Sequence, residues 1–136
     1  MSYELREHTA DIAVEASGET FAAVAAAVAD GLAAAMCESV PEEGDRFSLS
    51  VAAESREALL FEYLDELIYE RDVRSVLPVD NEATITEQSG EWTLDGSARG
   101  VPLSAVTARE VKAVTYSEMV VEEREGEWYA YVVFDV

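Results

Sequence analysis

The sequence has very few of the residues that build nucleic-acid-binding surfaces, disulfide bonds or zinc sites. Only one of its nine basic residues, Lys112, is a lysine, and the 29 acidic residues give a formal net charge of -20. Binding to nucleic-acid phosphates requires a basic surface, so we expect no direct nucleic-acid binding. A single cysteine, Cys37, excludes an internal disulfide, and one Cys with one His makes a poor zinc site.

Long apolar segments and a secretory signal are also missing. No apolar run reaches the roughly 18 residues of a membrane-spanning helix, and residues 1–6 lack the basic and apolar regions of a signal peptide. These features predict a cytoplasmic protein with no membrane partner. The excess of carboxylates with almost no lysine is typical of proteins that stay hydrated in high salt, which favours a halophilic protein over a functional acidic patch.

The chain length of 136 residues and the hydrophobic content of 49% predict one domain over residues 1–136 with one core. Hydrophobic alternation and turn residues predict strands over residues 3–7, 12–16, 47–53, 82–87, 92–97, 111–122 and 128–134, with turns at 17–18, 89–90 and 125–126. Residues 76–78 are expected to end the helical segment before them. The last two strands are expected to pair as a hairpin.

Two helices are expected among these strands. Large apolar residues recur at three- and four-residue spacing over about residues 19–36, an alanine-rich segment. Ser55 is placed to cap a second helix, with Glu57 in its first turn and an apolar stripe from Leu59 to Ile68. The pattern predicts an α+β fold: a two-layer domain in which a mixed or antiparallel sheet packs on two main helices.

Two aspartates stand out because apolar residues surround them. Asp135 ends the apolar run at the carboxyl terminus, and Asp11 precedes Ile-Ala-Val near the amino terminus. A buried carboxylate without a partner costs several kcal/mol, roughly, so such a residue is usually supplied with a cation, a hydrogen-bond donor or access to solvent. The pair suggests that the chain ends meet at a site. The alternative is that Asp11 caps a turn and Asp135 lies at an exposed strand end.

Four segments together resemble the archease family. They are His8-Thr9-Ala10-Asp11, residues 61–69 (FEYLDELIY), residues 110–116 (EVKAVTY) and the terminal residues 133–136 (VFDV). Their order and separations match the family over essentially the whole chain. One departure is Ser117, which stands where the family commonly has histidine.

The resemblance implies a small α+β protein that has no catalytic activity of its own. It implies a partner, the GTP-dependent RNA ligase that joins tRNA exon halves during tRNA splicing, whose guanylylation and multiple turnover the protein promotes. It also implies a divalent-metal site, calcium in particular, formed by Asp11, Asp135 and Val136. Carboxylate and main-chain oxygens are hard ligands that suit Ca²⁺, Mg²⁺ or Mn²⁺, and three protein ligands leave coordination positions open for water or a partner.

Two further residues are candidates for supporting roles at this site. His8 is expected to orient a ligand as a hydrogen-bond partner rather than to act as a general base. Lys112 lies inside the family-like segment of a chain that otherwise uses arginine, so either an ammonium is required there or one lysine remains by chance. Our hypothesis is that Lys112 neutralises carboxylates near the metal or contacts the nucleotide phosphate of the ligase.

Two other functions remain possible from the sequence. A metal-dependent phosphohydrolase built on Asp11, Asp135 and His8 would act without a partner, but the sequence offers no phosphate-binding loop or nucleophile elbow for it. A chaperone-like binding module would bind many clients and would need no metal. The fold alone does not separate these functions.

Overall fold

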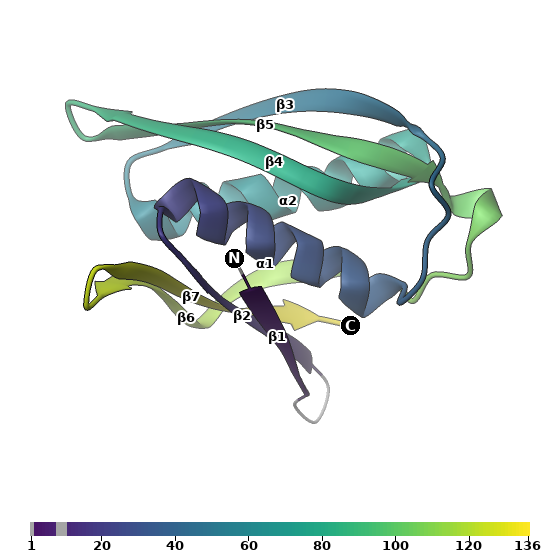
Figure 1. Ribbon diagram of the computed structural model, residues 1–136, viewed down its shortest axis with the longest axis horizontal. Helices are drawn as coiled ribbons and strands as arrows, with labels where there is room; N and C mark the ends of the chain where they lie inside the picture. The colour runs from purple at the N-terminus through teal and green to yellow at the C-terminus, as the bar shows by residue number, and fades with distance from the viewer. Residues whose placement is uncertain (1, 8–10) are drawn as a thin grey trace.

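The chain forms strands with two long helices set among them in the computed structural model, which describes residues 2–7 and 11–136 (Figure 1). In chain order the elements are β1 (Ser2–Glu7), β2 (Asp11–Gly18), α1 (Phe21–Met36), β3 (Asp45–Ala53), α2 (Arg56–Arg74), β4 (Val76–Gln88), β5 (Glu91–Pro102), the short 3-10 helix η1 (Leu103–Ala105), β6 (Ala113–Arg124) and β7 (Glu127–Asp135).

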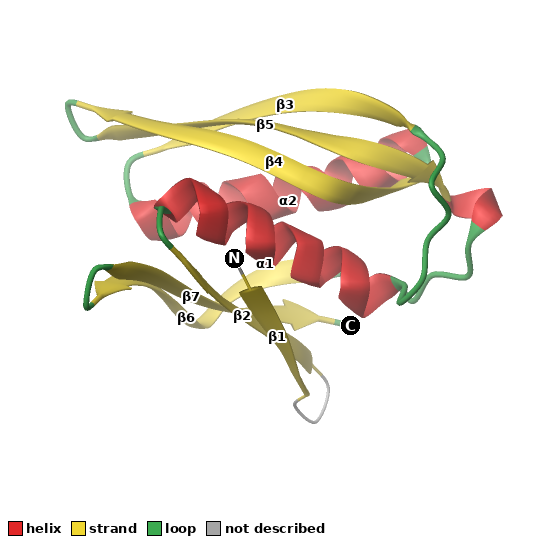
Figure 2. Ribbon diagram, in the orientation of Figure 1, coloured by secondary structure: helices red, strands yellow, loops and turns green. Residues whose placement is uncertain are grey.

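The strands form two sheets, and the two long helices lie between them (Figures 1 and 2). One sheet has the strand order β1-β2-β7-β6 and the other β3-β5-β4, and every neighbouring pair is antiparallel. This confirms the predicted α+β class with two main helices packed on antiparallel sheet. The strands divide between two sheets, and the helix layer therefore has a sheet on each side. The local sequence pattern did not predict this division.

Helix α1 is buried around most of its circumference because it lies between the sheets. It contacts β4 in one sheet and β2 in the other. Its buried residues therefore include many alanines outside the predicted apolar stripe. Thr20 caps the helix, since its hydroxyl accepts the N–H of Ala23 at 3.0 Å. A side chain at Gly31 would overlap Val14, so glycine there lets α1 approach β2 closely.

Helix α2 follows the sequence prediction. The hydroxyl of Ser55 accepts the N–H of Ala58 at 3.1 Å, which confirms the predicted cap. The predicted apolar stripe is buried: Leu59, Leu60, Tyr63, Leu64, Leu67 and Ile68. The helix contacts β3 on one side and β6 on the other. The buried stripe continues to Arg71, whose burial the sequence reading did not anticipate.

The hairpins form where the turn residues predict them. Residues 89–90 join β4 to β5, and residues 125–126 join β6 to β7. In each turn both residues have positive φ, between 53° and 85°, which is the geometry of the tight turns that fit twisted antiparallel strands. The predicted terminal hairpin is confirmed, and it brings the last residues of the chain back beside β6.

Three local predictions are wrong. Residues 76–78 begin β4 instead of ending a segment, and Pro78 is tolerated because β4 is an edge strand of its sheet. Residues 17–18 belong to β2, so the chain turns only at residues 19–20. Strand β6 begins at Ala113 and not at residue 111. In each case the pairing with a neighbouring strand decides where the strand begins or ends.

Candidate functional site

The two chain ends lie side by side as the paired strands β2 and β7. The register of this antiparallel pair places Asp11 directly opposite Asp135, and Ile12 opposite Phe134. Phe134 is fully buried in the core. Because side chains alternate along a strand, Asp11 and Asp135 belong to the opposite face of the sheet, away from the helices. The structure thus brings together the two aspartates that the sequence singled out.

Neither of the two aspartates forms an ion pair or a side-chain hydrogen bond with the side chains that the structure describes. Asp11 is half-buried and Asp135 is exposed. Directly opposite residues in a sheet have Cβ atoms about 4.5–5.5 Å apart, and like charges there are destabilising. A bound cation would remove this repulsion, and solvent reduces it.

Strand β6 places Ala113 next to the pair Asp11 and Asp135 across the sheet. Ala113 pairs with Asp135 on the side opposite to Asp11. The main-chain N–H of Lys112, the residue before it, donates to the carbonyl of Asp135 at 2.8 Å. The side chain of Lys112 is exposed. The backbone of Lys112, the predicted supporting residue, is therefore directly bonded to the backbone of Asp135.

Val136 and His8 complete the predicted set. Val136 is half-buried, packs against the core and directly follows Asp135. The carbonyl of Asp135 already accepts a hydrogen bond, so Val136 offers the uncommitted main-chain oxygens. His8 lies outside the described residues. Among residues 2–7 and 11–136 no group of three or more His, Cys, Asp or Glu side chains is arranged to hold a metal ion.

Comparison with known proteins places this arrangement in a family. The family model described as the Archease protein family matches residues 3–136 of the chain. The chain belongs to the archease family. It is 34% identical to the protein archease of Pyrococcus furiosus over 142 residues, covering 98% of each protein. It is 36% identical to the protein archease of Methanosarcina mazei over 140 residues, covering 98% of this chain and 95% of the relative.

Two solved structures share the archease fold. The solution structure of Methanobacterium thermoautotrophicum protein 1598 superposes with a TM-score of 0.85 at 28% identity, covering 98% of both chains. The crystal structure of a Thermotoga maritima archease, described as a possible chaperone, gives a TM-score of 0.65 at 22% identity, covering 96% of this chain and 94% of that one. The second likeness supports the fold alone.

Arg71 is a buried residue near the paired aspartates whose burial the sequence analysis did not predict. The residue as a whole is 7% exposed, and its Nη1 donates to the carbonyl of Val111 at 2.7 Å, next to Lys112. The main-chain N–H of Arg109 donates to the carbonyl of Met36 at 2.7 Å. These bonds fix the segment that leads into β6. The signal was available, because Arg71 continues the three- and four-residue spacing of the buried stripe of α2.

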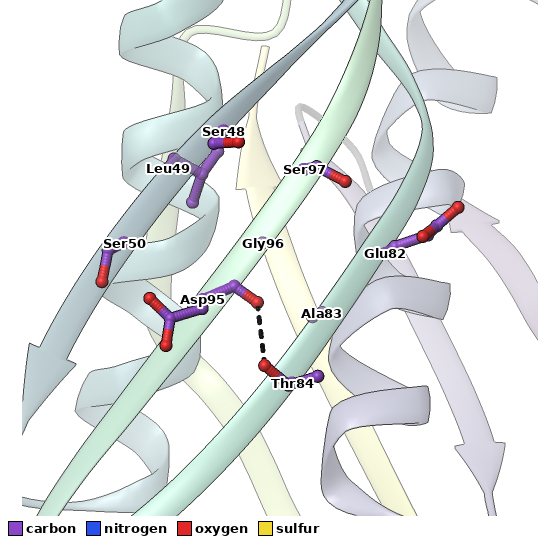
Figure 3. A pocket seen from close by; sticks show the side chains of 9 residues that line it. All are labelled: Ser48, Leu49, Ser50, Glu82, Ala83, Thr84, Asp95, Gly96 and Ser97. Atoms are coloured by element: carbon purple, nitrogen blue, oxygen red, sulfur yellow. Dashed lines mark hydrogen bonds between the residues drawn. The ribbon is translucent and has the colours of Figure 1, made fainter.

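A separate hollow lies on the outer face of the β3-β5-β4 sheet (Figure 3). It has a volume of about 660 Å³ and is lined by Ser48, Leu49, Ser50, Glu82, Ala83, Thr84, Asp95, Gly96 and Ser97. Its lining contains hydroxyls and two carboxylates but no basic or aromatic side chain. The hydroxyl of Thr84 donates to the main-chain carbonyl of Asp95 at 3.4 Å. None of the predicted site residues belongs to this hollow.

No helix in the described part of this archease-family protein has the length and apolar content needed to cross a membrane.

Proposed function

We propose that this protein is an accessory factor that activates the GTP-dependent tRNA-splicing RNA ligase. It promotes guanylylation of the ligase and its multiple turnover in exon ligation, and it has no catalytic activity of its own. Membership of the archease family, matched over residues 3–136, is the observation that supports this proposal most strongly. The net charge of -20 also favours a protein partner over direct contact with RNA phosphates.

We further propose that Asp11, Asp135 and Val136 hold a divalent cation, with calcium favoured over magnesium or manganese. The support is chemical. Asp11 and Asp135 are direct partners across β2 and β7, and neither carboxylate forms an ion pair with a described side chain. Oxygen donors suit a hard cation, and the small number of protein ligands leaves positions for water or for a group of the ligase. The cation would supply positive charge that an acidic protein otherwise lacks on its contact surface.

The experiment that tests the accessory role is a guanylylation assay. The ligase should take up labelled GMP faster when this protein is added at substoichiometric amounts, and this protein alone should neither bind GMP covalently nor hydrolyse a phosphoester. Phosphoester hydrolysis by this protein alone would instead indicate that it is a phosphohydrolase. Suppression of aggregation in unrelated client proteins, with no effect on guanylylation, would instead favour a chaperone-like module.

Replacing Lys112 with arginine should reduce stimulation of the ligase by about fivefold to tenfold while leaving the fold intact. Arginine keeps the charge, but its planar guanidinium differs in shape and hydration from the compact ammonium of lysine. The Lys112 side chain is exposed, and its backbone bond to Asp135 does not depend on the side chain. Guanylylation rates give the result, and full stimulation by a folded K112R protein would reject a role for the ammonium.

A further inference from the structure

A cavity of about 430 Å³ lies between the carboxyl-terminal ends of the two helices and the chain that leads into β6. It is lined by Met36, Arg71, Asp72, Leu103, Val106, Thr107, Ala108, Arg109 and Glu110. Its volume falls within the range of small-molecule sites, which is about 300–1,000 Å³. None of the proposed cation ligands belongs to its lining.

The buried guanidinium of Arg71 is only partly satisfied by the protein. Its Nε donates to Asp72 Oδ1 at 3.0 Å, and its Nη1 donates to the carbonyl of Val111 at 2.7 Å and contacts Met36 Sδ at 3.3 Å. A guanidinium has five N–H donors, and the two on Nη2 have no partner among the described residues. Nη2 is not among the fully buried polar atoms that lack a hydrogen-bond partner, so it keeps some accessible surface. Arg71 is one of the residues that line the cavity.

Arg109 is the second cation of the cavity, and it differs from the other arginines whose side chains are described. Each of those others has an acidic, carbonyl or aromatic partner: Arg46, Arg56, Arg71, Arg74, Arg99 and Arg124. The exposed side chain of Arg109 has none within that set. Its main-chain bond to the carbonyl of Met36 holds it at the cavity. An unpartnered arginine is unusual in a chain with so large an excess of carboxylates.

Both acidic residues that line the cavity are exposed. Asp72 has a side chain that is 64% exposed and already accepts a bond from Arg71, whose own side chain is 9% exposed. Glu110 is also exposed. Met36, Leu103 and Val106 give the cavity an apolar wall. The cavity therefore combines a buried cation and an unpartnered cation with an apolar surface, and its two carboxylates belong to exposed residues.

We propose that this cavity binds a small molecule with an oxyanionic group, a carboxylate or a phosphate monoester, attached to an apolar body. The N–H groups on Nη2 of Arg71 and the guanidinium of Arg109 bind the oxyanion, because planar guanidinium groups match carboxylate and phosphate oxygens in pairs. The apolar body packs on Met36, Leu103 and Val106. This site is separate from the cation site and does not depend on the proposed role with the ligase.

Titrations followed by the amide resonances of residues 107–110 test this proposal. The probes are phenyl phosphate, benzoate and inorganic phosphate at constant ionic strength, because the charge of -20 makes any anion titration sensitive to salt. Saturable shifts with phenyl phosphate or benzoate, and at least severalfold weaker binding of inorganic phosphate, are expected. The organic probe that binds more tightly identifies the group as phosphate or carboxylate. Inorganic phosphate binding as tightly as both organic probes would overturn the apolar part of the proposal.

The matched variants are R109Q and R124Q. Each removes one exposed arginine, but Arg124 lies near the β6–β7 turn and pairs with Glu122. R109Q should weaken binding of the preferred organic probe at least tenfold, whereas R124Q should change it by less than twofold. Because R109Q alters an exposed residue, it should fold even if variants of buried Arg71 do not. Equal affinity of R109Q and R124Q, or no saturable shifts in the unaltered protein, would overturn the proposal.

Discussion

The double variant D11N/D135N should bind calcium at least about tenfold more weakly and yet be more stable than the unaltered protein when calcium is absent. Carboxylate charge sets much of the calcium affinity of a site, so removing both charges weakens binding. The same charges repel each other across β2 and β7, where Asp11 and Asp135 are direct partners. Relief of that repulsion should stabilise the metal-free protein by about 0.2–1 kcal/mol. Calcium titration and urea unfolding in a chelator measure the two effects.

The matched control is D65N/D95N, which removes the same net charge from two exposed aspartates elsewhere in the chain. This control separates the local pair from the general effect of a charge of -20. It should retain its calcium affinity. An equal loss of affinity in the control would mean that calcium binds diffusely to an acidic surface. A less stable D11N/D135N protein in chelator would contradict the repulsion between the two carboxylates.

Replacing Phe134 with alanine should lower the free energy of unfolding by about 3–5 kcal/mol, which is the usual cost of truncating a large, fully buried aromatic side chain. Phe134 has no exposed surface and lies in the core one residue before Asp135. Its burial fixes which face of β7 points inward, and by alternation it sets Asp135 on the outer face. Urea unfolding of the metal-free protein measures the loss.

Tyr69→Ala is the control for this truncation because 57% of the Tyr69 surface is exposed on α2. Its free energy of unfolding should change by about 0.5 kcal/mol or less. If Phe134→Ala cost no more than this control, the end of β7 would not be anchored by the core. The placement of Asp135 would then need another cause.

The elements set by local sequence were predictable. Ser55 and Glu57 marked the start of α2, and the turns at residues 89–90 and 125–126 marked two hairpins, because capping and tight turns depend on residues close together in the chain. Asp11 and Asp135 were found because each is a charge among apolar residues. Their direct pairing was only a suggestion, since a register between strands at opposite ends of the chain has no local signal.

The division of strands between two sheets could not be predicted for the same reason. Alanines on every side of α1 indicated close packing, but periodicity alone gave one apolar stripe and not a helix covered on both sides. Arg71 was missed because a charged residue in an apolar stripe is normally assigned to its exposed edge. Its burial depends on the carbonyl of Val111, which the fold brings from 40 residues away.

The measurement that tests the central claim most directly is exon ligation at limiting ligase, with the unaltered protein, D11N/D135N and D65N/D95N compared in the same calcium-containing buffer. The unaltered protein and D65N/D95N should convert a single burst of ligated product into continued turnover. D11N/D135N, although folded, should leave only the burst. Continued turnover with D11N/D135N would contradict a role for the paired aspartates in activating the ligase, and a burst alone with the unaltered protein would contradict the activator function itself.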